Sequence, residues 1–516
     1  MSKFIKGTLI LLAAGFITRI LGFINRIAIA RLLGEEGVGL YMMAYPTFIL
    51  VVTITQLGLP VAISKRVAEA EAKKDSRKVK KILVVSLTTT LSLSIIFTPL
   101  LMFGAPIIAD QIFTDQRTLY PLLAISPIVP IIAVSSVLRG YFQGKQNMKP
   151  SAISQVIEQA VRIGFIFYFT HLLYPYGIEY AASGAMAASI IGELVSLLYL
   201  ATMFKLKKHF PMRKNFFRAL NKSKGIFKEL MSIALPTLGS RMIGSISWFL
   251  EPIVVTHSLA LAGITTVVAT KQYGALTGFA MPLLLLPSFI TFALSTALVP
   301  SISEAYALKN LKLVENRLQQ AIKFALISGG LSSVVLYVLA EPLMEFLYHS
   351  TNGAIFLKLM APFFILYYIQ GPLQAVLQAL DLAKAAMINS IFGNIIKIGC
   401  IFMLASHPSF GIIGAALGIV VGMMVTTLLH YATVLKTIPI TFFVRQFFKI
   451  IGSIIITGVC GIYLFTAIKP MIPLIASITV SIVGMVCFYF IILFVLRVIN
   501  FSEIKRIILM IHPSMK

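Results

Sequence analysis

The stretch TRILGFIN, residues 18–25, has a close counterpart in SRMIGSIS, residues 240–247. A second matched pair follows later in the chain, VRIGFIF at residues 161–167 and IKIGCIF at residues 396–402. Each stretch is apolar apart from a few small polar residues and one basic residue. Because the pairs keep their order and a similar separation, the chain is predicted to contain an internal duplication.

The basic residues of these four stretches are Arg19, Arg162, Arg241 and Lys397. A charge at the centre of a bilayer costs at least ~2.5–3.5 kcal/mol, so such side chains normally face a wet cavity or a charged partner. At about 1.5 Å per residue, all four lie roughly 17–20 Å along helices that enter from one side of the membrane. We therefore expect one basic layer near mid-membrane, and its sign predicts an anionic ligand.

The composition predicts an all-α, multi-pass membrane protein. Of 516 residues, 58% are hydrophobic and 12% are charged. Apolar stretches of about 20 residues, the length that crosses a bilayer, recur from end to end. The segments between them are too short for a soluble domain. We expect about fourteen transmembrane helices, at residues 6–32, 40–64, 82–108, 119–142, 151–173, 180–204, 229–257, 270–300, 313–340, 354–380, 385–406, 411–434, 448–468 and 472–498.

Positive charge is concentrated in alternate loops. Residues 65–81 and 205–228 are rich in Lys and Arg, whereas residues 34–39 and 341–352 contain neither. Under the positive-inside rule this alternation places both termini in the cytosol. The net charge of +26 is accordingly interpreted as loop charge that attracts anionic membrane lipids, and no nucleic-acid partner is expected.

The duplication and the helix count together predict the domain organisation. We expect a six-helix half at residues 1–215, a second at 216–440, and a further helix pair with a basic cytosolic tail at 441–516. An even number of helices gives both halves the same orientation. Parallel repeats of this kind are related by an axis along the membrane normal, carry substrate between them and work by rocking one half against the other.

Two acidic residues, Glu158 and Glu193, fall inside apolar segments near the expected basic layer. The i,i+4 spacing of Glu158 and Arg162 would allow a purely structural ion pair, and Glu193 could pair with Arg162 or Arg19. Two acids against four basic residues leave a surplus, which favours a cationic cavity. Arg26 lies nearer the outer end of its helix, where a side chain reaching to the interface is the alternative interpretation.

Sequence motifs for enzyme chemistry are missing. Residues 140–145, GYFQGK, lack the spacing of a nucleotide phosphate loop, and neither an HExxH nor a GxSxG motif occurs. Cys400, Cys460 and Cys487 lie in apolar segments and have no histidine at ligand spacing. We therefore expect a protein that is not an enzyme and has no catalytic residue, no cofactor and no metal site.

Longer stretches resemble the MurJ-like and polysaccharide-exporter branches of the multidrug/oligosaccharidyl-lipid/polysaccharide flippase superfamily. Within that superfamily they are most similar to a sporulation branch implicated in spore cortex formation. The resemblance spans nearly the whole chain. Its stretches are KGTLILLAAGFITRILGFINRIAIARLLGEEGVGLYMM (6–43), QLGLPVAISKRVAEA (56–70), SSVLRGYFQGKQNMKPSAISQVIEQ (135–159), ATKQYGALTGFAM (269–281) and QGPLQAVLQAL (370–380).

The resemblance implies a lipid-linked saccharide as cargo, an undecaprenyl-diphosphate peptidoglycan precursor, whose diphosphate arginine can bind bidentately. TRILGF around Arg19 is similar to the SRVLGF pattern of MurJ flippases, whose arginine lines the central cavity. The next cavity arginine of that family corresponds to Asn25 here, with Arg26 adjacent, and its second-helix arginine pair falls near Val51 and Val52. The residues expected to line the cavity are Arg19, Asn25, Arg26, Arg162, Arg241 and Lys397, with Glu158 and Glu193 as charge partners.

The function expected from these observations is export or flipping of an anionic lipid-linked saccharide for spore cortex synthesis, in the cell membrane around the forespore. Two alternatives remain open. A drug or cation exporter of the same superfamily would need acidic cavity residues. A non-transporting scaffold would recruit cortex-synthesis enzymes through its basic cytosolic loops.

Overall fold

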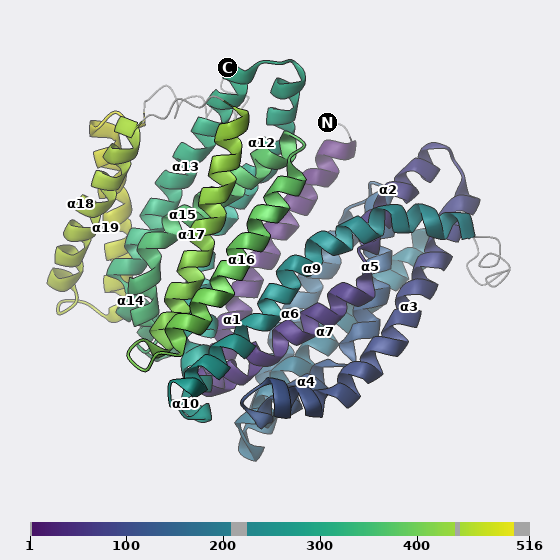
Figure 1. The fold of residues 1–516 in the computed structure, drawn as a ribbon, viewed down its shortest axis with the longest axis horizontal. Coiled ribbons are helices and arrows are strands. Elements are labelled where there is room, and N and C mark those ends of the chain that lie inside the picture. Colours follow the sequence, from purple (N-terminus) through teal and green to yellow (C-terminus); the bar gives the residue numbers. More distant parts are fainter. Residues whose placement is uncertain (1–2, 208–223, 439–443, 500–516) are drawn as a thin grey trace. The chain divides into compact units, whose positions relative to one another are not determined.

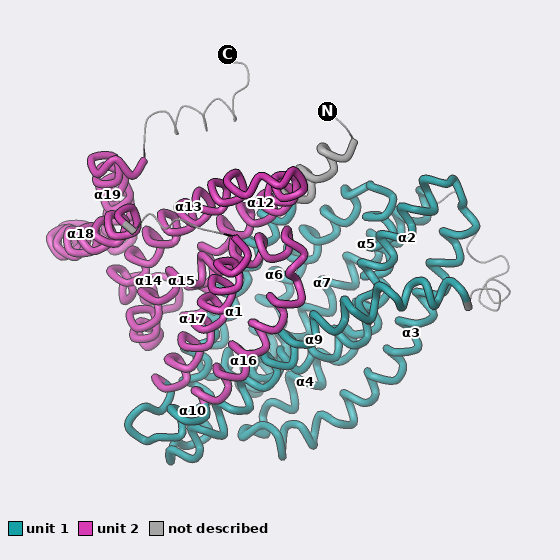
Figure 2. Tube along the Cα trace, turned by 45° about the horizontal axis from the view of Figure 1, so that its top comes forward, with its two compact units in different colours: residues 1–278, 402–412 teal, residues 279–401, 413–516 magenta. Residues whose placement is uncertain are grey.

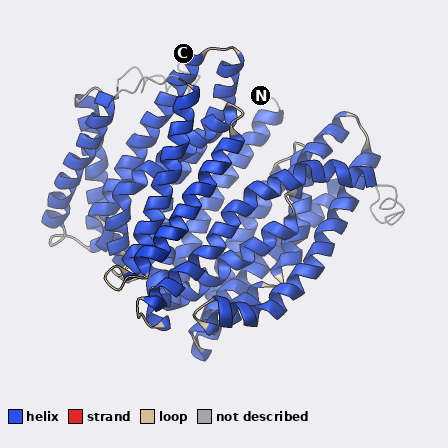
Figure 3. Cartoon of the chain, in the orientation of Figure 1, coloured by secondary structure: helices blue, strands red, loops and turns tan. Residues whose placement is uncertain are grey.

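The structure is a computed structural model that describes residues 3–207, 224–438 and 444–499, and every element in these ranges is helical (Figure 3). The prediction of an all-α protein is confirmed. The elements of the first part of the chain, labelled in Figure 1, are α1 (Lys3–Gln56), α2 (Leu59–Ala72), α3 (Ser76–Ile107), η1 (Ile108–Ile112), η2 (Gln116–Thr118), α4 (Leu119–Ile125), α5 (Ile128–Gly144), α6 (Lys149–Leu173), η3 (Tyr174–Tyr176), α7 (Ile178–Lys207), α9 (Lys224–Leu261) and α10 (Thr266–Gly274).

The remaining elements follow the same all-helical pattern. They are η4 (Ala275–Ala280), α11 (Met281–Leu285), α12 (Ser288–Ala307), α13 (Leu311–Val338), α14 (Ala340–Tyr348), α15 (Ala354–Ala379), α16 (Ala383–Ala405), α17 (Gly411–Thr437), α18 (Val444–Ile468) and α19 (Leu474–Val495).

Many of these helices are long enough to cross a bilayer. Among the described residues, eleven are long and apolar enough, or twelve if the pair Gln116–Ile125 and Ile128–Gly144, bent by 42°, forms one span. The eleven include one continuous stretch, Ala14–Ala72, that covers two of the expected helices. The chain is therefore a multi-pass membrane protein.

Glycine and proline decide where the first two expected helices end. Residues 6–32 and 40–64 were expected as separate helices, but α1 runs through both segments and kinks at Gly34, where φ is 62° and ψ is −171°. Glycine adopts such a positive φ without steric cost. The second expected helix stops early, at Gln56, because Gly58 is left-handed with φ 66° and Pro60 starts a new helix, α2.

The expected helix at residues 270–300 is also interrupted. It consists of α10, a π-helical turn, the short α11 and then α12. Pro282 and Pro287 mark the starts of α11 and α12, because proline lacks the N–H that a continuous helix needs at those positions.

The helices form two compact units, Met1–Gly278 with Phe402–Ile412, and Phe279–Ile401 with Ile413–Lys516 (Figure 2). Helix α9 therefore belongs to the first unit. Within that unit, an apolar cluster that includes Leu59, Leu83 and Tyr141 joins α2, α3 and α5. The expected division into repeats at residue 215 concerns sequence duplication, and it stays a prediction.

Helices α6 and α7 approach each other closely in the first unit. A Cβ atom added at Gly184 would lie 2.8 Å from the carbonyl oxygen of Phe169, and one added at Gly192 would lie 2.8 Å from that of Glu158. Small residues let helix backbones approach in this way. The contact at Gly192 places its neighbour, Glu193, next to the charged side chains of α6.

Candidate functional site

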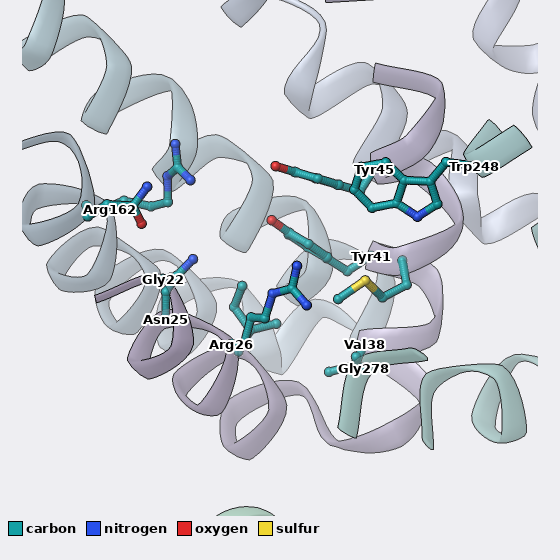
Figure 4. A pocket seen from close by; sticks show the side chains of 12 residues that line it. Gly22, Asn25, Arg26, Val38, Tyr41, Tyr45, Arg162, Trp248 and Gly278 are labelled. Carbon is teal, nitrogen blue, oxygen red and sulfur yellow. The ribbon is translucent and has the colours of Figure 1, made fainter. Parts of the chain in front are cut away.

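A polar cavity of about 180 Å³ lies within the first unit, between α1, α6 and α9 (Figure 4). Of the described residues that line it, none is acidic and two are arginines, Arg26 and Arg162. The complete lining consists of Gly22, Asn25, Arg26, Ile29, Val38, Tyr41, Met42, Tyr45, Gln159, Arg162, Trp248 and Gly278.

Helix α1 supplies most of this lining from both sides of its kink. Gly22, Asn25, Arg26 and Ile29 follow i, i+3, i+4, i+7 spacing, so they share one face of the first segment. Val38, Met42 and Tyr45 come from the segment beyond Gly34. The positive φ at Gly34 thus lets one helix contribute two walls to the same cavity.

Helix α9 adds an aromatic wall. Its Trp248 contacts Tyr45 edge to face, with ring centroids 5.7 Å apart and an interplanar angle of 66°. Tyr45 in turn stacks on Tyr41 at 5.6 Å and 16°. One turn before Trp248, the Ser245 hydroxyl lies 3.0 Å from that of Thr53, which holds α9 against α1.

The two cavity arginines differ in their partners. Arg162 donates to Glu158 Oε1 at 2.5 Å, the i,i+4 pair that the spacing suggests. Arg26 has no acidic side chain within 4 Å in the described part of the chain. In Figure 4 the phenol oxygens of Tyr41 and Tyr45 point to the side of Arg162, and the Arg26 guanidinium lies beside Tyr41. Among the described residues, the cavity thus holds a cation without an acidic partner.

Behind Arg162 lies a buried ion network that connects α5, α6 and α7. Arg139 Nη2 donates to Glu158 Oε2 at 3.0 Å, to Glu193 Oε1 at 3.2 Å and to the hydroxyl oxygen of Ser196 at 3.1 Å. Glu158 therefore bridges Arg139 and Arg162. The expected partner of Glu193 was Arg162 or Arg19, and this is corrected to Arg139, because the close α6–α7 contact turns Glu193 towards α5.

The other residues predicted for the cavity lie elsewhere. Arg19 and Arg241 do not line it, and both side chains are exposed, on α1 and α9 respectively. Lys397 lies in the second unit, on α16, and is partly buried. Asn25 does line the cavity and is only 6% exposed. The structure thus brings Asn25, Arg26 and Arg162 together, while convergence of the remaining basic residues stays a prediction.

Several residues of the cavity and of the ion network behind it are not singled out by the sequence alone. Arg139 lies three residues from the expected end of its helix, where a basic residue looks interfacial. Tyr41, Tyr45 and Gln159 look like ordinary residues of apolar helices. Trp248 carries the one available signal, because it is the single tryptophan of the chain and lies inside an apolar segment.

An arrangement of arginine, amide and aromatic side chains can bind an anion that also carries polar groups. Arginine forms charge-assisted, bidentate hydrogen bonds to phosphate oxygens. Aromatic side chains with a few placed polar groups are typical of small-molecule sites. The cavity therefore suits a polar anionic ligand better than a cation.

Comparison with known proteins gives a consistent result. Residues 4–306 match the family described as Polysaccharide biosynthesis protein, and residues 252–403 match the family described as MatE. Stage V sporulation protein B of Bacillus subtilis (strain 168) is 59% identical over 98% of this chain and 97% of its own length. Lipid II flippase MurJ of the same organism is 27% identical over 77% of this chain and 76% of its own length.

A solved structure shows the same fold at low sequence identity. The structure described as lipid II flippase MurJ in an inward closed conformation has a TM-score of 0.71 and 17% identity, over 94% of this chain and 98% of that one. The arrangement of helices is thus similar to that of a MurJ structure.

Proposed function

The chain belongs to the polysaccharide biosynthesis protein family, and we propose that it flips an anionic lipid-linked saccharide across the cell membrane. It is a membrane transporter homologous to stage V sporulation protein B and not an enzyme. The proposed cargo is an undecaprenyl-diphosphate peptidoglycan precursor for spore cortex synthesis. The relationship to a lipid II flippase supports this class of cargo.

The observation that carries the proposal is the cavity cation Arg26. Its guanidinium lacks an acidic partner among the described residues and lines the same cavity as a second arginine, Arg162. A diphosphate would provide the missing anionic partner in bidentate geometry. Arg19 lies outside the cavity, one turn before Gly22 on nearly the same face of α1, and would extend the basic surface along the proposed path of a phosphate group.

The proposed route follows from the predicted architecture. Fourteen crossings in two parallel six-helix halves, with both termini cytosolic, would alternate access by rocking. Described helices lie in each of the fourteen expected segments, which supports the proposal. Arg19, Arg162, Arg241 and Lys397 would then form the basic layer around the moving cargo, in the membrane that surrounds the forespore.

A drug or cation exporter of the same superfamily is disfavoured by the charges of the cavity. Cation binding and proton coupling need acidic groups that face the ligand. Glu158 and Glu193, the two acidic residues behind Arg162, are both paired with Arg139, and Glu158 also with Arg162. None of the described lining residues is acidic.

Charge reversal at Arg26 tests the proposal. The protein is reconstituted in liposomes and the movement of lipid II between leaflets is followed. Arg26→Glu should abolish flipping because the carboxylate repels the diphosphate, and Arg26→Lys should retain part of the rate because the charge stays but the bidentate geometry is lost.

The matched control is Arg77→Glu, at an exposed position at the start of α3, which should flip at the wild-type rate. Flipping by Arg26→Glu at the wild-type rate would show that the cavity does not carry the cargo. Absence of flipping by the wild-type protein would favour a scaffold that recruits cortex-synthesis enzymes.

A further inference from the structure

Two residues that line the cavity each carry a buried acceptor atom with no hydrogen-bond donor among the described residues. Asn25 Oδ1 and Gln159 Oε1 are both buried, and neither has a partner in the described part of the protein. Leaving such an atom unpaired is costly, so a donor is expected from outside the chain. A diphosphate cannot supply it, because phosphate diester oxygens carry no hydrogen near neutral pH. Water can supply it, and so can a hydroxyl or an amide N–H of a ligand that displaces the water.

The aromatic wall lies in the same cavity as these acceptors. Trp248 lines the cavity and is 36% exposed, so its ring is not fully covered by the protein. A pyranose ring has an apolar face of C–H groups and a rim of hydroxyl groups. The C–H face would pack on the Trp248 ring while hydroxyl groups at the rim reach amide oxygens, a combination that neither a lipid tail nor a phosphate offers.

The size of the cavity limits what it can hold. Its volume of about 180 Å³ is below the ~300–1,000 Å³ of sites that enclose drug-sized ligands. At ~30 Å³ per water molecule, it has room for about six waters, which is close to one sugar ring. A disaccharide with a peptide would extend well beyond it.

We propose that Asn25, Gln159 and Trp248 form a subsite for the first sugar ring of the cargo, a hexopyranose attached directly to the diphosphate held by Arg26. This inference rests on the proposed function and adds a selectivity to it. The chain distinguishes a sugar-bearing polyprenyl diphosphate from the bare polyprenyl diphosphate that remains after the sugar has been transferred, so the spent carrier competes poorly for the cavity.

Intrinsic fluorescence provides a direct assay, because Trp248 is the single tryptophan of the chain. The full-length protein in detergent is titrated with two probes, a short-chain polyprenyl diphosphate and the same molecule linked to N-acetylglucosamine. Two additional hydrogen bonds to neutral groups predict about tenfold tighter binding of the sugar-bearing probe.

Variants show which residues produce the preference for the sugar-bearing probe. Asn25→Leu and Gln159→Leu should each lose most of the preference for the sugar-bearing probe, measured as the ratio of the two dissociation constants. Binding of the bare probe by a variant, at any affinity, also shows that the variant is folded. Gln155→Leu is the matched control, since it lies one turn earlier on α6, is partly buried and does not line the cavity.

The outcomes distinguish failure of the sugar subsite from failure of the proposed function. Equal binding of both probes by the wild-type protein overturns the subsite and leaves the anion site standing, and so does an unchanged preference in both leucine variants. Binding of neither probe by the wild-type protein overturns the proposed function itself. Calorimetry with Trp248→Phe checks the aromatic contact: the substitution should weaken binding of the sugar-bearing probe more than binding of the bare probe.

Discussion

Replacing Arg139 with glutamine removes the cation that Glu158 and Glu193 share. The Arg139 Nη2 atom lies 3.0 Å from one carboxylate and 3.2 Å from the other, and the side chains of Glu158 and Glu193 are only 10% and 3% exposed. Glu158 keeps its contact with Arg162 at 2.5 Å. Glu193 retains no other basic side chain within 4 Å in the described part of the chain.

The expected loss of stability follows from this difference between Glu158, which keeps a basic partner, and Glu193, which does not. Removing one partner of a buried ion pair costs ~3–5 kcal/mol, because an uncompensated charge stays behind. We therefore expect Arg139→Gln to lower the free energy of unfolding by about that amount. Adding Glu193→Gln removes the orphaned charge, so the double variant should recover at least ~1 kcal/mol, within the usual range of coupling between contacting residues.

Equilibrium unfolding in mixed detergent micelles, followed by helical circular dichroism, measures these free energies. Lys358→Gln is the control, because its pair with Glu341, at 2.6 Å, joins side chains that are 45% and 61% exposed. Exposed pairs contribute only ~0–1 kcal/mol. Equal destabilisation by Arg139→Gln and Lys358→Gln, or strict additivity of Arg139→Gln and Glu193→Gln, would refute the shared-cation network.

Three further predictions concern other parts of the protein. Burial opposes ionisation of Asp115, but hydrogen bonds from Arg117 and Thr270 outweigh it and hold the pKa of this carboxyl below its ordinary value. The stabilisation that ionised Asp115 provides is therefore present at a pH above that ordinary pKa and is lost as the pH falls through the folded-state pKa. Acid below about pH 4 should thus lower the unfolding midpoint of the wild type more than that of Asp115→Asn. Gly274→Ala should cost ~1–3 kcal/mol, because its Cβ meets the carbonyl oxygen of a residue of α1, whereas Gly164→Ala, with nothing within 4 Å, should be near neutral in the same unfolding assay. In liposomes with clamped potentials, an inside-negative potential should accelerate flipping. The energy gained should be less than the ~2.3 kcal/mol per charge per 100 mV of a bare diphosphate, because basic residues that move with the cargo offset its charge. A rate that does not change with potential would indicate a carrier driven by concentration alone.

The interruptions of the helices show which helix boundaries the local sequence predicts and which it does not. Hydropathy places helical segments correctly because burial in lipid depends on each segment's own composition. The breaks at Gly34 and at Pro60 involve residues whose conformational preferences are visible in the sequence, yet whether a helix bends or ends at them depends on its neighbours. Hence α1 continues through Gly34 as a kinked helix, while a new helix begins next to Pro60.

By itself, the sequence determined the membrane class, the order of the helical segments, the family and the presence of intramembrane charges, because composition, periodicity and motif are local properties. Only the tertiary structure decided which charges meet. Arg139 and Glu193 are 54 residues apart and pair because α5 and α7 pack together. Arg19 and Arg26 lie on nearly the same face of α1, two turns apart, but only Arg26 reaches the cavity, because the opposing wall from α6 and α9 is level with the later turn. Which charged side chains pair and which reach the cavity depends on distances between segments that are remote in the chain. No single segment determines these distances.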